Sequence, residues 1–121
     1  MRILGFSEHW AKLGQDTFST FRFPRRDRDW YVNEPVQIIY KPRQKGGGEK
    51  LGIAEIIAKE PRWTKPKLRD DIPDITQEEA MADGFEDLRT MWEWILKTYD
   101  IRRLLREPMN KLTLRWLNET D

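Results

Sequence analysis

The sequence predicts an α+β fold in which a small β-barrel of about five to six strands is flanked by helices. Alternating apolar residues dominate the first half of the chain, an amphipathic helical pattern fills the third quarter, and an alternating run closes it. Short strands of this kind often curl into a barrel, because closure removes exposed sheet edges. The length of 121 residues predicts one domain, residues 1–121.

The chain begins with a short apolar run, residues 2–6, that predicts a first strand. Ser7 is a suitable N-cap for a short helix over residues 8–13. Gly14 follows that segment and would end the helix, because glycine readily adopts the conformation of a helix C-terminus.

Residues 17–23 alternate in a way that predicts the second strand. Thr20 and Arg22 then share one face, and Phe21 points to the other face, where it would be buried. Pro24 ends the run, because proline cannot donate a hydrogen bond to a sheet. A guanidinium beside a hydroxyl suits an anionic or planar polar ligand.

Two further segments predict a long hairpin. Residues 30–32 and 36–40 have strand character, which resumes at residues 51–59. The three consecutive glycines at 46–48 predict its tip, because they carry no side chains to pack. Residues 60–73 contain three prolines and seven charged residues and predict a long irregular connection.

Helix signals begin after residue 75. Thr76 and Glu79 form the T-x-x-E pattern of a capping box, and Gly84 would end that helix. Asp87 or Glu86 can cap a second helix. Its apolar residues fall on one face, which predicts core packing. They are Leu88, Met91, Trp92, Ile95, Leu96 and Tyr99.

The end of the chain supplies the last two elements. Residues 101–106 add a helical turn before Pro108, and residues 112–117 alternate as a final strand. Strands in the first half and at the end, with helices between them, are typical of an α+β fold.

Charge is distributed unevenly, although the net charge is only +1. Residues 17–69 hold 13 Lys and Arg against 6 Asp and Glu, whereas residues 74–121 hold 7 against 11. The basic surplus indicates contact with nucleic acid or phosphate. Cysteine is absent and His9 is the single histidine, which excludes disulfides, thiolate chemistry and the usual Cys/His zinc site. We expect no metal and no cofactor.

The sequence also bears on location. Its first residues contain too short an apolar run for a signal peptide and soon meet Glu8. No run of about 18 apolar residues exists that could span a membrane. We therefore expect a cytoplasmic protein without a membrane partner.

Three stretches resemble an ASCH domain, a family of the PUA-like superfold. They are TFSTFR at 17–22, KLGIAEIIAKE at 50–60 and DITQEEAMADGFEDLRTMWEWI at 74–95. The resemblance implies a pseudo-barrel with a cleft beside the helices that binds RNA or a nucleoside-like ligand. It also implies, for some small members, hydrolysis of an acylated cytidine by a lysine, a threonine and an acid.

The resemblance assigns positions residue by residue. Arg22 matches the arginine of the first motif, Thr20 matches its second threonine, and Asp83 lies near the position of the acid. Thr17 occupies the lysine position. A hydroxyl cannot replace an amine that activates a nucleophile, because its pKa lies far above neutrality.

A lysine would therefore have to reach the site from elsewhere. Lys12 and Lys41 are the two examples that the sequence offers. Without such a lysine the hydrolytic mechanism is impaired.

The leading functional hypothesis is RNA or nucleotide binding in a cationic cleft beside the barrel. Arg22 and Thr20 would contact a base or phosphate, and the other basic residues would attract phosphates without regard to sequence. Trp63 either stacks on a base or covers the core. The predicted binding residues are Thr20, Arg22, Arg25, Arg26, Arg28, Lys41, Trp63, Lys65 and Lys67.

A second hypothesis is an amidohydrolase or nuclease that acts on modified nucleosides or RNA. Thr17 or Thr20 would supply the hydroxyl, Asp83 the acid or base, and Arg22 the anion stabiliser. The alternative is structural, with Arg22 and Asp83 paired as an ordinary salt bridge.

A third hypothesis is a protein-interaction domain. Six tryptophans exceed what a small core needs, so some could form an exposed patch, and Trp94 falls off the main helical stripe. Two further residues stay open. Glu55 is either a buried acid with a partner or a rim residue, and His9 is predicted to lie at the surface.

Overall fold

The computed structural model describes residues 1–8, 10–64 and 71–117. Four α-helical or 3₁₀ segments and five strands lie within these residues. The strands are β1 (Arg2–Phe6), β2 (Thr17–Arg22), β3 (Pro35–Tyr40), β4 (Glu49–Arg62) and β5 (Met109–Trp116). The helices are the 3₁₀ turn η1 (Ala11–Gly14), α1 (Gln77–Ala82), α2 (Leu88–Thr98) and α3 (Ile101–Arg106).

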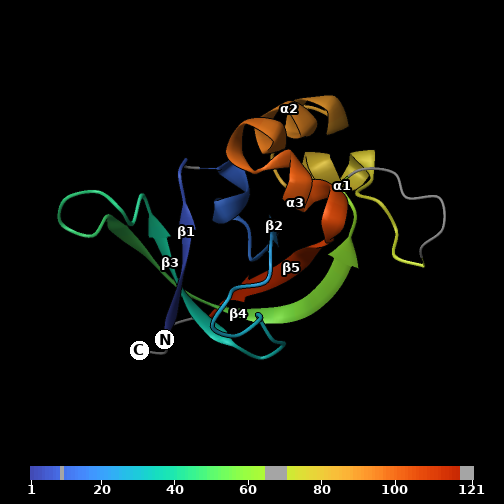
Figure 1. The fold of residues 1–121 in the computed structure, drawn as a ribbon. Coiled ribbons are helices and arrows are strands. Elements are labelled where there is room, and N and C mark those ends of the chain that lie inside the picture. The colour runs from blue at the N-terminus through green and yellow to red at the C-terminus, as the bar shows by residue number, and fades with distance from the viewer. Residues whose placement is uncertain (9, 65–70, 118–121) are drawn as a thin grey trace.

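The strands form one mixed sheet in the order β1-β3-β4-β5-β2. β1 and β3 are parallel, and every other neighbouring pair is antiparallel. The long β4 curves through the middle of the sheet, and α1, α2 and α3 gather on one side of it (Figure 1). The predicted α+β class is therefore confirmed.

The two edge strands, β1 and β2, approach each other without pairing. Within the described residues no ladder joins them, so the sheet is open and the predicted barrel is not confirmed. Two side-chain contacts nevertheless connect these edges. The Arg22 Nη2 donates to the carbonyl oxygen of Gly5 at 2.7 Å, and the rings of Phe6 and Phe18 lie 6.2 Å apart.

Two apolar clusters hold the fold together, and β2 contributes to both because its side chains alternate. One cluster lies within the curve of the sheet and includes Phe18, Ile38 and Ile56. The other lies between the sheet and the helices and includes Phe21 and Met91. This second cluster fixes the helices against β2, where the candidate site lies.

Several local predictions are confirmed. β3 and β4 form the hairpin, and Gly46, Gly47 and Gly48 have positive φ angles at its tip. The capping box on α1 is formed, since Thr76 Oγ1 accepts from the Glu79 N–H at 3.1 Å. Asp87 caps α2 by accepting from the Thr90 N–H at 2.7 Å, and α3 matches residues 101–106. The predicted last strand lies in β5 except for Leu117, because β5 ends at Trp116.

Two predicted elements are wrong. Residues 30–32 form no strand, because Glu34 and Asn33 turn the chain here: the Glu34 N–H donates to the Tyr31 carbonyl, and Asn33 has a φ of 74°. The helix predicted over residues 8–13 is the 3₁₀ turn η1, whose N-cap has no side-chain hydrogen bond. Ser7 therefore does not cap it.

Two other boundaries differ from the sequence pattern. The connection predicted over 60–73 begins later, since β4 runs on to Arg62, and residues 65–70 lie outside the described residues. The apolar stripe of α2 is narrower than predicted, because Leu96 is 47% exposed while Met91 and Ile95 are buried. No α-helix in the described ranges is long and apolar enough to cross a membrane.

Candidate ligand-binding site

A pocket of about 690 Å³ lies where β1, β2 and η1 face the α1–α2 turn and α2. This volume falls within the range of small-molecule sites. We call it the central pocket. Its polar lining includes Lys12, Thr20, Arg22, Lys41 and Asp83, and its aromatic lining comprises Phe6, Trp10, Phe21, Phe85, Trp94 and Tyr99.

A buried ion pair lies in this lining. The Lys12 Nζ donates to the Asp83 Oδ1 and also to the Ser19 carbonyl oxygen, the latter at 2.7 Å. Both charged residues are buried, with 5% and 6% of their surface exposed. A buried ion pair is weak evidence for stability, because desolvation offsets much of the attraction, so its place in a pocket indicates a functional group.

Burial changes the proton affinity of both partners. Loss of hydration lowers the pKa of Lys12, although the charge of Asp83 opposes this, and the nearby Arg22 lowers it further. Loss of hydration likewise raises the pKa of Asp83 against the attraction of Lys12 and Arg22. A lowered lysine pKa and a raised acid pKa bring the proton affinities of the two groups closer together, which favours proton transfer.

The two charged residues come from segments that are far apart in the sequence. Lys12 belongs to η1, just before β2, and Asp83 is the C-cap residue of α1. Gly84 follows with a φ of 113°, and the Trp10 ring occupies the space that a Cβ at this glycine would need. The glycine therefore allows Trp10 to pack against the turn that carries Asp83.

Arg22 lies beside Thr20, as the alternation of β2 predicts. Its Nε donates to the Thr20 Oγ1 at 3.2 Å, and its Cζ lies 4.8 Å from the centre of the Phe6 ring. Loss of hydration lowers the pKa of Arg22 from its ordinary value, yet an arginine stays charged in proteins. Among the described residues Arg22 forms no salt bridge, and Asp83 pairs with Lys12 instead.

Lys12, and not Thr17, places an amine at the central pocket. Thr17 is exposed, pairs with Arg115 in the sheet and does not line the central pocket. Lys12 lines the pocket and contacts the strand through Ser19. No local sequence pattern indicates the Lys12–Asp83 contact, because the two residues lie 71 positions apart in the chain.

The remaining predicted residues are dispersed. Lys41 lines the central pocket, whereas Arg25 and Arg26 line a neighbouring hollow. Arg28 is exposed, with its Cζ 5.1 Å from the Tyr31 ring. Trp63 is buried, does not line the central pocket, and forms a backbone bridge with Asp74. Lys65, Lys67 and His9 lie outside the described residues.

The open questions on other side chains are answered in part. Glu55 is half-buried and pairs with Arg115 at 3.5 Å, as a rim residue does. All six tryptophans lie in described segments, and each is buried or half-buried. In the ranges that the structure describes, no group of three or more Asp, Glu or His side chains is arranged to hold a metal ion.

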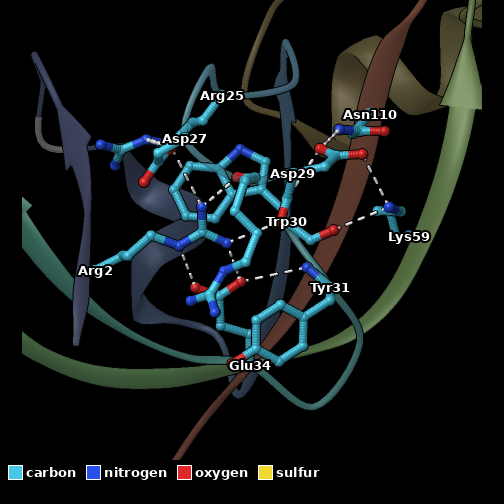
Figure 2. Close-up of polar contacts among 10 residues, drawn as sticks. Arg2, Arg25, Asp27, Asp29, Trp30, Tyr31, Glu34, Lys59 and Asn110 are labelled. Carbon is cyan, nitrogen blue, oxygen red and sulfur yellow. Dashed lines mark hydrogen bonds and ion pairs between the residues drawn. The ribbon is translucent and has the colours of Figure 1, made fainter.

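The loop between β2 and β3 is held by a network that the sequence did not reveal. The Arg2 guanidinium donates to both carboxylate oxygens of Glu34, at 2.6 and 2.5 Å, and to the Asp29 carbonyl oxygen at 2.9 Å. Its Cζ lies 4.5 Å from the centre of the Trp30 ring. Figure 2 shows Arg2 between Glu34 and Asp27. The network fixes the loop that carries Arg25 and Arg26.

Comparisons with protein-family models, with curated proteins and with solved structures found no match. We therefore infer function from the central pocket and its surroundings.

Proposed function

We propose that this chain is an RNA- or nucleotide-binding domain whose central pocket holds a nucleobase. The observation that carries the proposal is the position of Arg22, whose guanidinium lines a pocket of suitable size beside the Thr20 hydroxyl. A planar guanidinium and a hydroxyl can hydrogen-bond the edge of a base.

The aromatic walls support the same ligand. Trp10 lies 5.1 Å from Phe85, and Phe85 lies 5.8 Å from Trp94, measured between ring centroids. All three line the central pocket. Unpaired bases stack on such side chains, which contribute roughly 1–3 kcal/mol per base.

The resemblance to ASCH domains adds a fold and a setting to the proposal. The PUA-like barrel that the resemblance implies would need β1 and β2 to pair, and the Arg22–Gly5 hydrogen bond already connects these two edge strands. Arg25, Arg26, Arg28, Lys65 and Lys67 would then attract phosphates of RNA in the cytoplasm.

The test is a titration of short single-stranded RNA, followed by tryptophan fluorescence, at low and moderate salt. We expect binding that weakens with salt and an affinity about tenfold lower for Arg22→Gln, because a charged hydrogen-bond donor is lost. Arg115→Gln, an exposed arginine outside the central pocket, is the control and should bind as the wild type does. Absence of binding at low salt, or unchanged affinity of Arg22→Gln, would contradict the proposal.

A second candidate function is hydrolysis of an acylated nucleoside. The Lys12–Asp83 pair and the Thr20 hydroxyl line one pocket, which favours this activity over a purely passive site. Water would attack the carbonyl carbon of the amide directly, or the Thr20 hydroxyl would attack first and water would then hydrolyse the resulting acyl ester. In both cases the C–N bond would break, the acyl group would leave as a carboxylic acid, and the Lys12–Asp83 pair would move the proton to the leaving amine.

Hydrolysis is tested by incubating the protein with an acylated cytidine and measuring released cytidine. Thr20→Ala should lose turnover, whereas Thr20→Ser keeps the hydroxyl and should retain most of it. Equal turnover by both variants would remove the role of the hydroxyl. No release by the wild type would remove the activity and leave the binding proposal in place.

A further inference from the structure

A second hollow of about 550 Å³ adjoins the central pocket. Ile3, Arg22 and Tyr99 line both spaces. Arg22 therefore lies at the boundary between the central pocket and the second hollow, where it could contact a ligand that extends into both spaces.

The lining of this second hollow is strongly cationic. Among its described residues, the charged side chains are four arginines and one acid, Asp27. The arginines are Arg22, Arg25, Arg26 and Arg103.

Two of these guanidiniums are compensated by neighbouring carboxylates. Arg25 pairs with Asp27 at 3.3 Å, and Arg103 pairs with Glu107 at 2.5 Å. Within the described ranges Arg22 and Arg26 form no salt bridge. Asp83 attracts Arg22 without forming a salt bridge with it. Two guanidiniums without a salt-bridge partner match a phosphate group, which carries one or two negative charges and accepts bidentate hydrogen bonds.

The hollow is also held in shape before any ligand binds. Arg103 donates from its Nη2 to the Pro24 carbonyl oxygen at 3.1 Å, and its Cζ lies 4.1 Å from the Phe23 ring centre. Arg25 lies over Trp30, with 5.6 Å between its Cζ and the ring centre, in the loop anchored by Arg2 (Figure 2). A preorganised site loses less entropy on binding.

We propose that the second hollow binds the phosphate attached to the nucleoside whose base occupies the central pocket, with Arg22 contacting both parts. This inference rests on the proposed function. It names the ligand as a nucleotide and excludes a free nucleoside as the preferred ligand. The phosphate comes from a mononucleotide or from a strand, and both present the same group.

The experiment compares the dissociation constants of the common ribonucleosides, their 5′- and 3′-monophosphates, a short RNA oligonucleotide and inorganic phosphate. We expect a monophosphate to bind at least about tenfold more tightly than its nucleoside at low salt, as a charge-assisted contact provides. Arg26→Gln is the main variant, because Arg26 is exposed and its replacement leaves the core intact. Arg26→Gln should remove most of the difference in affinity between a monophosphate and its nucleoside, and Arg103→Gln should do the same.

Arg102→Gln is the matched control, because Arg102 lies on α3 beside Arg103, is 84% exposed and lines neither space. It should keep the full gain. Tighter binding of the oligonucleotide identifies a strand as the source, and equal binding identifies a mononucleotide. Nucleosides that bind as tightly as their phosphates, or a gain that survives Arg26→Gln and Arg103→Gln, would overturn this inference alone. Absence of binding by all nucleosides, nucleotides and RNA would overturn the proposed function with it.

Discussion

Lys12 and Asp83 form an ion pair in which both partners are buried in a pocket wall. Removing one partner leaves the other charge buried without compensation. We expect Asp83→Asn or Lys12→Met to lower the free energy of unfolding by about 3–5 kcal/mol. The double variant Lys12→Met/Asp83→Leu should stay within about 2 kcal/mol of the wild type, because no charge is left to desolvate.

Urea denaturation of the wild type, the two single variants and the double variant measures these free energies of unfolding as a double-mutant cycle. A double variant as unstable as the sum of the singles would show that Lys12 and Asp83 are not coupled, and would contradict the prediction. The predicted result, a folded protein without the pair, would then allow its role in ligand binding to be measured directly.

Glu34 gives the pH dependence of stability. Burial alone raises the pKa of Glu34, but hydrogen bonds from Arg2 and from the Tyr31 N–H outweigh it, and the pKa lies below its ordinary 4.5. Because the pKa of Glu34 is lower in the folded state, its carboxylate stabilises the fold at pH values above 4.5. This contribution is lost as the pH falls through the pKa of the folded state. The wild type should therefore exceed Glu34→Gln in stability at neutral pH, and this excess should shrink in acid.

The measurement is the free energy of unfolding of both proteins across the acid range. An excess that is unchanged or larger at low pH would contradict the assigned proton linkage. Asp87→Asn, which keeps the capping oxygen and removes only its charge, gives a comparison at a residue without a buried partner.

At the scale of elements, the tip of the β3–β4 hairpin allows a matched test. A Cβ on Gly48 would meet the carbonyl oxygens of Tyr40 and Lys41, whereas one on Gly46 meets open space. Both glycines have positive φ angles, so the backbone strain of an alanine is similar at each. We expect Gly48→Ala to cost at least about 1 kcal/mol more than Gly46→Ala in thermal or urea unfolding. Equal costs would show that the tip relaxes.

The elements also show how far sequence reasoning reaches. The caps at Thr76 and Asp87, the glycine tip and the strand alternation were predictable, because each depends on residues close in the chain. Residues 30–32 were misassigned, since three residues give too short an alternation to separate a strand from a turn. The narrow stripe of α2 depends on what packs against it, which the sequence does not contain.

The candidate site likewise contains features that the sequence predicts and features that it does not. Thr20 and Arg22 were predictable as neighbours from the alternation of β2. The Lys12–Asp83 contact, the Arg2–Glu34 pair and the second hollow were not, because each joins segments far apart in the chain. The placement of Trp63 likewise depends on the bridge to Asp74.

At the scale of the whole molecule, the basic surplus of residues 17–69 should appear as a salt dependence of RNA binding. The logarithm of the association constant should fall linearly with the logarithm of salt concentration. Arg26→Gln should reduce the slope by roughly 0.7–1, because one phosphate contact is lost. Arg89→Gln, at an exposed residue of α2, should leave it unchanged. Equal slopes for the wild type and Arg26→Gln would place the phosphate contacts elsewhere.

The central claim is that a nucleobase enters the pocket beside Arg22. The most direct test is an NMR titration of the isotope-labelled chain with a short single-stranded RNA, followed through the backbone amides. We predict that the largest shifts fall on β2 around Thr20 and Arg22 and on the α1–α2 turn around Asp83 and Phe85. Shifts confined to residues outside the central pocket, or no shifts at saturating RNA, would contradict the claim.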